Sequence, residues 1–170
     1  MLLTSAEANK RLRKLNEEMT ALELKESKAA VFNAAMGEDE KKIRPEYSFD
    51  ETQEQLESLR NQIISLKHRI SGFNLRTKVE GYDLTIDEAL TLLPMLTERR
   101  KTLSKMASRL PRERASSYGF GSNAVIDYTI ANYDIASVQE AYDDLNDKVA
   151  ALQNALDVTN STVRGIEAEE

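Results

Sequence analysis

The second half of this chain repeats part of its first half at a constant offset of 86 residues. Residues that a helical pattern alone does not require recur at this offset: Tyr47, Gln53, Glu54 and Asn74 reappear as Tyr133, Gln139, Glu140 and Asn160. A repeated supersecondary unit usually cannot bury its apolar face alone and needs a second copy beside it. The repeat therefore predicts a scaffold of paired helices, with a chance match between two heptad helices as the alternative.

Apolar residues alternate at spacings of three and four along four segments, which is the pattern of an amphipathic or coiled-coil helix. The segments predict helices from about Ser5 to Ala35, from Asp50 to Asn74, from Thr85 to Leu110 and from Asp134 to Val163. A helix near 30 residues is about 45 Å long, and a narrow apolar stripe suits a hairpin of two helices. We therefore expect an all-α fold in which two duplicated long hairpins form an elongated antiparallel coiled coil or four-helix bundle.

The helix ends and the segments between the helices carry further signals. Thr85 and Glu88 match a capping box, in which a hydroxyl and a carboxylate satisfy free amides of the first turn. Gly37 is expected to end the first helix and to open a loop toward Pro45, with a short extended piece at 43–49. The apolar stripe of the third helix is expected at Leu90, Leu93, Leu96, Leu103, Met106 and Leu110.

Residues 112–133 are the least regular part of the chain. Ile126, Tyr128 and Ile130 occupy every second position, which is the apolar–polar alternation of a β-strand. We therefore expect a short extended arm near 124–133, in the form of a small hairpin or a single extended segment. The acidic residues from Glu167 to the end of the sequence are expected to fray.

The composition limits the class of protein. The sequence has 170 residues, of which 31% are charged and 6% aromatic, and it contains no Cys. These values predict one helical domain, 1–170, whose pseudo-repeats span 1–80 and 81–170. Without Cys there is no disulfide and no thiolate nucleophile. The first residues do not form a signal peptide, and no apolar run approaches the roughly 20 residues of a membrane span, so we expect a soluble, cytoplasmic protein.

No cluster of residues demands a particular catalytic chemistry. His68 is the single histidine and is expected to be solvated, because a catalytic zinc site needs further His or Cys ligands. The carboxylate clusters at 17–18, 54–57 and 143–147 are expected to be solvated helix faces, since a di-metal bundle also needs Glu-x-x-His motifs. Gly119 and Gly121 lack the third Gly and the Lys of a phosphate loop. We expect a protein that is not an enzyme and holds neither a cofactor nor a metal.

A basic segment, 99–114, is the strongest candidate for nucleic-acid binding in a chain of net charge -6. Its members are Arg99, Arg100, Lys101, Lys105, Arg109, Arg112 and Arg114. They could hold a phosphate backbone while Tyr118 and Phe120 stack on bases. The alternative is that the helical part of the segment pairs with Asp143, Asp144 and Asp147 across a hairpin. The overall acidity favours the pairing, so nucleic-acid binding is the second hypothesis.

The first hypothesis is a structural or regulatory interaction protein that acts through protein partners and forms a homo-oligomer, without membrane contact. Its helix faces and the irregular arm would contact the partner, through Tyr118, Phe120, Ile126 and Tyr128. Asn74 and Asn160 are expected to end their helices as caps, with a paired polar site as the alternative. Tyr47 and Tyr133 are expected to pack in equivalent places at the end of the bundle.

Several short motifs lie between about residues 56 and 162. They are Ile70 with Asn74, Leu84-Thr85-x-x-Glu88-Ala89-Leu90, Val138-Gln139 to Leu145 after Asp134, and Asn160-Ser161-Thr162. In this order they resemble the septicolysin-like family of small bacterial helical proteins. Members of that family typically end the last helix with Asn-Trp, where this chain has Asn160-Ser161. The resemblance implies a coiled-coil helical fold and a bacterial, cytoplasmic setting, and it brings no catalytic residues and no established activity.

Overall fold

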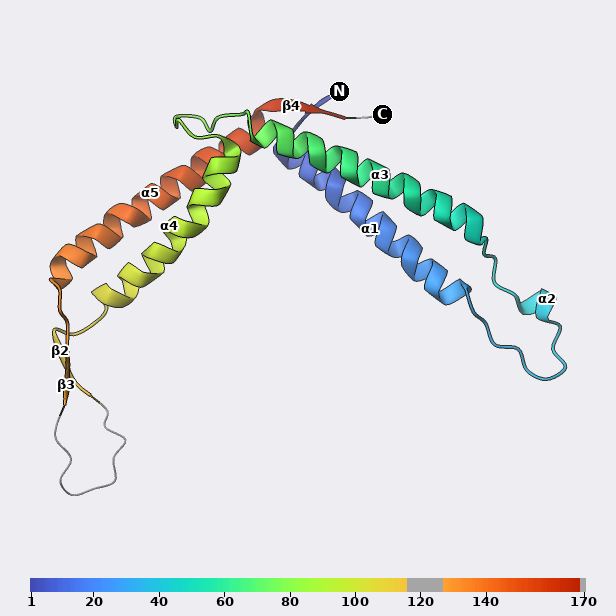
Figure 1. Ribbon diagram of the computed structural model, residues 1–170, viewed down its shortest axis with the longest axis horizontal. Helices are drawn as coiled ribbons and strands as arrows, with labels where there is room; N and C mark the ends of the chain where they lie inside the picture. Colours follow the sequence, from blue (N-terminus) through green and yellow to red (C-terminus); the bar gives the residue numbers. More distant parts are fainter. Residues whose placement is uncertain (116–126, 169–170) are drawn as a thin grey trace, which may run out of the picture. The chain divides into compact units, whose positions relative to one another are not determined.

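The computed structural model describes residues 1–115 and 127–168. This part of the chain is mainly helical, with a few short strands (Figure 1). The elements are β1 (Leu2–Thr4), α1 (Ser5–Ala29), α2 (Glu40–Ile43), α3 (Phe49–Asn74), α4 (Ile86–Ala107), β2 (Arg112–Arg114), β3 (Tyr128–Ile130), α5 (Ile135–Thr162) and β4 (Arg164–Glu167). The chain divides into two compact units: unit 1 comprises residues 1–77 and the chain from 158 onward, and unit 2 comprises residues 78–157.

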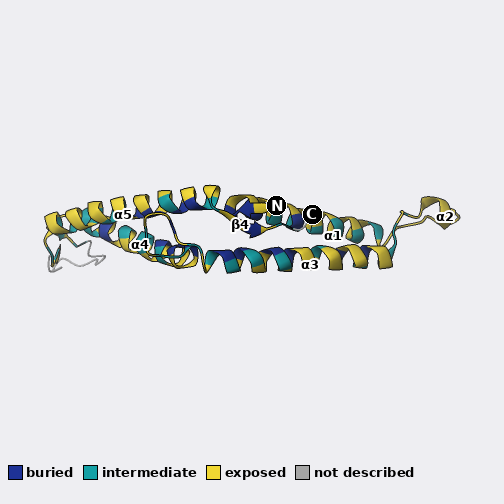
Figure 2. Cartoon of the chain, turned by 90° about the horizontal axis from the view of Figure 1, so that it is seen from above, coloured by how far each residue is buried: buried dark blue, intermediate teal, exposed yellow. Residues whose placement is uncertain are grey.

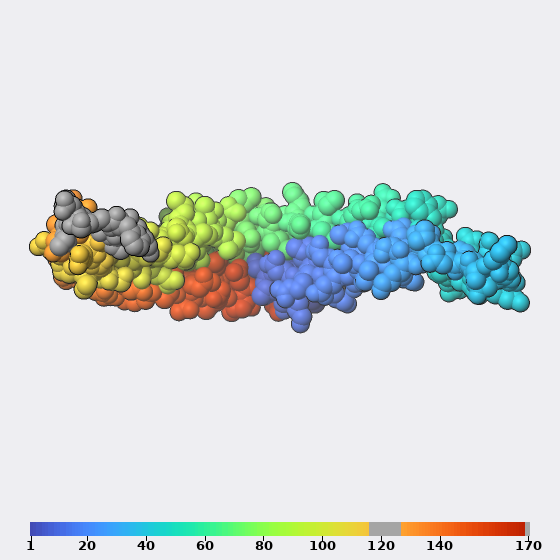
Figure 3. All heavy atoms as spheres, turned by 90° about the horizontal axis from the view of Figure 1, so that it is seen from below, coloured from blue at the N-terminus to red at the C-terminus, as the bar shows by residue number. Residues whose placement is uncertain are grey.

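Unit 1 is built on α1 and α3, which run antiparallel and lie side by side (Figures 1 and 3). Two polar contacts mark their register. At one end the Ser5 hydroxyl lies 3.5 Å from the amide oxygen of Asn74. Near the other end the Gln53 side-chain amide donates to the Glu26 carboxylate over 3.1 Å. The two helices have nearly equal lengths, 25 and 26 residues, so each covers the other from end to end.

The base of unit 1 joins the two ends of the described chain. Strands β1 and β4 pair antiparallel, with Leu3 opposite Ile166. Ile166 is only 1% exposed, and the neighbouring Gly165 lies against the ring of Phe73 so closely that a Cβ atom would stand 2.6 Å from it. The buried residues of α1, from Ser5 to Leu15, lie in its half near this base, whereas those of α3 run along the helix from Thr52 to Phe73 (Figure 2). The core of unit 1 therefore follows α3 and includes the terminal strands at the base.

The first helix is shorter than the expected span from Ser5 to Ala35, because it ends at Ala29. Its partner α3 begins at Phe49, so residues beyond Ala29 have no helix to pack against, and an unpartnered helical turn is marginal in water. The expected start is confirmed: Thr4 and Glu7 form a capping box. The expected extended piece at 43–49 is shorter than predicted: Arg44 and Ser48 have extended backbones, but Ile43 ends the short helix α2 and Phe49 begins α3. Helix α3 is capped by Ser48 instead of the expected Asp50.

Unit 2 is closed at its base by a short continuous turn between residues 78 and 85. The Val79 amide donates to the Leu84 carbonyl over 2.8 Å, and Lys78 forms an ion pair with Asp83. Val79 and Ile86 are buried beneath this turn. The predicted capping box of Thr85 and Glu88 is confirmed at the start of α4.

The apolar stripe of α4 differs in part from the expected one. Leu93 and Leu103 are buried as expected, and Leu96 and Met106 are partly buried, but Leu90 is exposed and Leu110 lies beyond the helix end at Ala107. The buried positions begin instead with Ile86 and Ala89. Ala89 has a small side chain, so a stripe judged from large apolar residues does not include it. The next residue, Leu90, is large and apolar, and it places the expected stripe one position away from the buried one.

The stripe of α5 matches its prediction at every position: Val138, Tyr142, Leu145, Val149, Leu152, Leu156 and Thr159 are all buried or partly buried. Asp134 caps the helix, since its carboxylate accepts from the amides of Ala136 and Ser137. Helix α5 begins in unit 2, and its last turn belongs to unit 1. After it the chain forms β4, so the expected fraying is wrong for Glu167, which pairs with Leu2.

The expected extended arm is confirmed where the structure describes it. Strands β2 and β3 pair antiparallel, with Glu113 opposite Thr129. Residues 124–126 of the expected arm lie outside the described residues.

Candidate interaction surfaces

The connection between α1 and α3 exposes large apolar side chains at the far end of unit 1. Val31 is 78% exposed, Met36 is fully exposed, and Phe49 is 61% exposed at the first position of α3. Phe32 and Ile43 in the same connection are exposed as well. These side chains belong to no helical stripe that packs on a partner within unit 1, so they are available to a binding partner.

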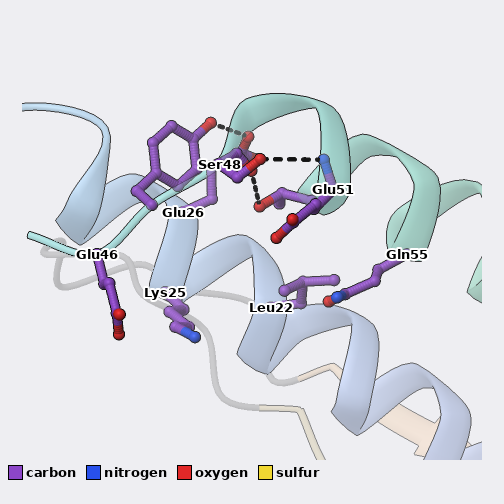
Figure 4. Close-up of a pocket in the computed structure, with 9 residues that line it drawn as sticks. Leu22, Lys25, Glu26, Glu46, Ser48, Glu51 and Gln55 are labelled. Atoms are coloured by element: carbon purple, nitrogen blue, oxygen red, sulfur yellow. Dashed lines mark hydrogen bonds between the residues drawn. The ribbon is translucent and has the colours of Figure 1, made fainter.

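Polar contacts tie this connection to the end of α1. The Tyr47 hydroxyl donates to the Glu26 carboxylate over 2.8 Å, and this hydrogen bond raises the pKa of Tyr47. Gln53 donates to the same carboxylate. The Ser48 hydroxyl accepts from the Glu51 amide and caps α3 (Figure 4). The last residues of the connection are therefore held in place by α1 and α3.

A polar hollow of about 330 Å³ opens beside these contacts. Leu22 forms part of its floor from α1, while Lys25, Glu46 and Glu51 bring charges to its edge (Figure 4). Both signs of charge are present, and no cluster of convergent donors or acceptors fits one ligand. The hollow contributes polar surface to the far end of unit 1.

Unit 2 has an apolar groove of about 500 Å³ between α4 and α5. Its apolar wall comes from both helices and from the preceding turn: Tyr82, Leu84, Leu92, Leu96, Ala151 and Leu152. Asp147 and Lys148 stand at its rim. Such a groove can accept apolar side chains of a binding partner.

Some side chains of the basic segment 99–114 form hydrogen bonds, ion pairs or ring contacts, and others do not within the part of the chain that the structure describes. Arg100 donates to the side-chain oxygen of Asn146 on α5 over 3.1 Å, and Lys101 pairs with Glu98 on its own helix. The Arg112 guanidinium lies 3.8 Å above the ring of Tyr128, a cation–π contact between β2 and β3. Four further members are exposed and form no ion pair within residues 1–115 and 127–168: Arg99, Lys105, Arg109 and Arg114.

The alternative reading of this segment, in which it pairs with the acidic face of α5, is wrong for the described residues. None of Asp143, Asp144 and Asp147 forms an ion pair with α4 in this part of the chain. Asp143 instead accepts from Gln139 on its own helix over 3.0 Å. The single polar link from α4 to this face is the neutral side chain of Asn146, among the bonds described for these two helices.

Three of the four predicted partner-binding residues, Tyr118, Phe120 and Ile126, lie outside the described residues, as do Gly119 and Gly121. The fourth, Tyr128, is 47% exposed, and one face of its ring is covered by Arg112. Ring contact within the hairpin reduces the area that Tyr128 can offer to a partner.

The two repeated tyrosines lie in equivalent places. Tyr47 precedes α3 and donates to α1, and Tyr133 precedes α5 and donates to the Met106 carbonyl in the last turn of α4 over 2.9 Å. Each tyrosine therefore links the two helices of its unit at the far end. The asparagines differ more: Asn74 is the last residue of α3, whereas Asn160 lies two residues before the end of α5.

Within the described chain, no group of three or more His, Cys, Asp or Glu side chains is arranged to hold a metal ion. His68 is exposed on α3. None of the described helices has the length and apolar character needed to cross a bilayer.

Sequence reasoning missed the apolar side chains of the connection at 31–49. A signal was present, since Val31 and Phe32 follow the stripe of α1 without continuing its spacing. Both side chains lie past the end of α1 and face solvent.

No family model and no curated protein matches this chain. Among solved structures, the fold is similar to that of a functionally unknown conserved protein from Corynebacterium diphtheriae, with a TM-score of 0.61 and 20% sequence identity. The similarity covers 96% of this chain and 99% of that chain. At this identity the likeness shows a shared fold and carries no function.

Proposed function

We propose that this is a non-enzymatic structural or regulatory protein that acts by binding protein partners. The observation that carries the proposal is the set of large apolar side chains exposed in one connection, between α1 and α3: Val31, Phe32, Met36, Ile43 and Phe49. Single exposed apolar residues are normal on a protein surface, but several in one segment mark an interaction site.

The connection is also anchored well enough to serve as a binding surface. Tyr47 and Gln53 both donate to Glu26, so the returning chain is fixed to the end of α1. An anchored surface loses less conformational entropy on binding than a free one does. The partner would gain contact with apolar side chains already held near one place.

Further parts of the proposal concern architecture and setting. We take the two units as duplicated helical hairpins of an antiparallel coiled coil or four-helix bundle, supported by the equivalent tyrosines Tyr47 and Tyr133. The chain would act as a homo-oligomer in the bacterial cytoplasm. Membership of the septicolysin-like family remains a proposal that rests on the short sequence motifs alone.

The test is capture of partners by the tagged full chain, with two variants compared. Val31→Asp with Met36→Asp places charge on the exposed connection of unit 1. Leu90→Asp with Ile130→Asp makes the same chemical change at two exposed apolar residues of unit 2. The proposal predicts that captured proteins are lost with the first pair and retained with the second. Retention with the first pair, or loss with the second pair alone, would contradict it.

Nucleic-acid binding is the second candidate, and a specific observation favours it. Arg99, Lys105 and Arg109 are exposed and form no ion pair with the acidic face of α5 in the described chain. A phosphate backbone could therefore reach them without first breaking an internal pair.

This candidate predicts an affinity for single-stranded RNA that falls steeply with salt, because bound counterions are released. Arg99→Glu with Lys105→Glu should abolish the binding. This pair is a better choice than one that includes Arg100, which hydrogen-bonds Asn146. Absence of any salt-dependent binding by the wild-type chain would remove this candidate.

A further inference from the structure

The outward face of α3 is acidic. Asp50, Glu54 and Glu57 follow one another at spacings of four and three, so they share one face of the helix. The buried Leu56 and Ile63 lie on the opposite face, toward α1. All three carboxylates are exposed and form no ion pair within residues 1–115 and 127–168, and the chain has no Lys or Arg between residues 46 and 59.

The outward face of α4 is basic. Lys101 and Lys105 are one turn apart, and Arg109 follows by another turn, just past the helix end. The buried Leu93 and Leu103 lie on the other side of the helix. The chain has no Asp or Glu between residues 99 and 112. Within the described chain the aspartates of α5 form no ion pair with this face, and Lys101 pairs with Glu98 of its own helix.

Exposed apolar side chains stand beside both charged faces. Phe49 and Ile64 stand near the two ends of the acidic face, and Met95 and Leu110 stand near the two ends of the basic face. Phe49 and Ile64 are 15 residues apart within α3, which is about 22 Å at 1.5 Å per residue, whereas Leu110 lies past the end of α4 at Ala107. The two faces are opposite in charge, and each has exposed apolar side chains beside it.

We propose that two copies of this chain associate by placing the acidic face of α3 of one copy against the basic face of α4 of the other. Each copy carries both faces, and in a two-fold dimer the acidic face of each copy would contact the basic face of the other. Complementary charge sets the register and speeds association, while the exposed apolar side chains supply contact area. The inference rests on the proposed function and names a second copy as one of its protein partners.

The charge pattern favours a second copy over nucleic acid. A phosphate backbone would occupy the basic face of α4 and leave the acidic face of α3 without a role. A second copy satisfies both faces at once. The same reasoning requires that the association weaken with salt, because exposed charges are screened beyond about 10 Å at 0.1 M ionic strength.

The test is the mass of the full chain in solution, measured by sedimentation velocity over a range of concentrations at low and high salt. Glu54→Lys with Glu57→Lys, and separately Lys105→Glu with Arg109→Glu, place like charges opposite one another. Each pair should raise the dimer dissociation constant at least about tenfold, since like charges at an interface cost several kcal/mol. Combining all four substitutions restores opposite charges and should restore the dimer.

Glu17→Lys with Glu23→Lys serves as the matched control. Both glutamates are exposed on α1, and the pair makes the same change in net charge away from either face. The control should leave the dissociation constant unchanged. If a charge reversal lowers the helical circular dichroism signal, Glu54→Gln with Glu57→Gln replaces it and should weaken the dimer by a smaller factor.

A wild-type chain that stays monomeric at every concentration would overturn the inference. So would a dimer that the four combined substitutions do not restore, or one that the control weakens equally. Salt-sensitive changes of shape at constant monomer mass would show that the two faces meet within one chain, which also contradicts the proposal. None of these results touches the capture experiment at Val31 and Met36, so the two proposals fail separately.

Discussion

Units 1 and 2 both contain an antiparallel pair of helices, but they close their bases in different ways. Unit 1 uses strands from both ends of the described chain, and Arg164 reaches back to the Leu2 carbonyl across 162 residues of sequence. Unit 2 uses a turn of a few residues, in which Val79 bonds to Leu84. The base of unit 2 can therefore form from neighbouring residues, whereas the base of unit 1 needs the chain on both sides of unit 2.

The far ends of the two units differ as well. The connection of unit 1 leaves Val31 and Met36 exposed without a covering side chain among the described residues. At the far end of unit 2, β2 and β3 pair, and Arg112 covers one face of Tyr128. This difference supports the proposal that the connection of unit 1 binds a partner.

The largest predicted effect breaks the base of unit 1. Ile166→Ala removes a side chain that is 1% exposed, and should lower the free energy of unfolding by about 2–5 kcal/mol. Ile130→Ala, at an exposed position of β3, should change it by less than about 0.5 kcal/mol. Urea unfolding followed by circular dichroism measures both. Equal effects of the two changes would mean that β4 does not close unit 1.

A smaller effect is expected from crowding the same base. Gly165→Ala would place a Cβ 2.6 Å from the ring of Phe73, which is itself buried. Overpacking of this kind should lower the unfolding free energy by about 1–3 kcal/mol.

The matched control is Gly72→Ala. Gly72 lies within α3, where a Cβ would meet only the Arg76 side chain at ordinary contact distance. That change should stabilise the protein by roughly 0.5–1 kcal/mol, because Ala favours a helix interior over Gly. A destabilising Gly72→Ala or a neutral Gly165→Ala would show that the packing against Phe73 is looser than described.

The two capping boxes allow a direct comparison of the units. Thr4 caps α1 and Thr85 caps α4, and each hydroxyl accepts from an amide three residues later over 3.2 Å. Thr4→Ala and Thr85→Ala should each cost about 1 kcal/mol of unfolding free energy. Thr4 is 2% exposed and continues into β1, so its replacement should have the larger effect. Urea unfolding measures both changes. A larger loss of unfolding free energy for Thr85→Ala than for Thr4→Ala would contradict the expectation that the more buried cap contributes more.

The smallest effect concerns pH and Glu7. The hydrogen bond from the Thr4 amide lowers the pKa of Glu7, and Arg164 adds to the shift. A carboxyl whose pKa is lowered by folding stabilises the protein above its unfolded-state pKa of about 4.3, and this contribution is lost as the pH falls through the folded-state pKa. The difference in unfolding free energy between wild type and Glu7→Gln should therefore be largest near pH 6 and shrink near pH 3. A difference that grows toward acid pH would mean that folding does not lower the pKa of Glu7.

Periodicity was sufficient to predict the helices that stay paired along their length. Every expected stripe position of α5 is buried or partly buried, because a regular heptad leaves one frame for packing. In α4 the buried position is the small Ala89, whereas the large apolar Leu90 beside it is exposed. The expected stripe of α4 was therefore misplaced because it was drawn through the larger side chain.

Tertiary pairing set the features that the sequence did not predict. Helix α1 ends at Ala29 because α3 begins at Phe49, and no local residue marks that limit. Strands β1 and β4 are only three and four residues long, too short for a visible alternation, and they pair across most of the chain. Such contacts depend on segments that local patterns do not connect.

The candidate surfaces were predicted unevenly for the same reason. The basic residues of α4 are visible in the sequence, but whether they pair with Asp143, Asp144 and Asp147 depends on how α4 and α5 pack against each other. The exposed apolar residues near Val31 became a surface only once the end of α1 was known.

Amide hydrogen exchange on the full chain tests most directly the claim that the two units are closed independently. Ile166→Asp puts a charge in the base of unit 1 and should remove protection from α1 and α3 while leaving the amides of α4 and of residues 135–157 protected. Loss of protection in both units together would contradict the account, because it would show that the chain opens as one cooperative body.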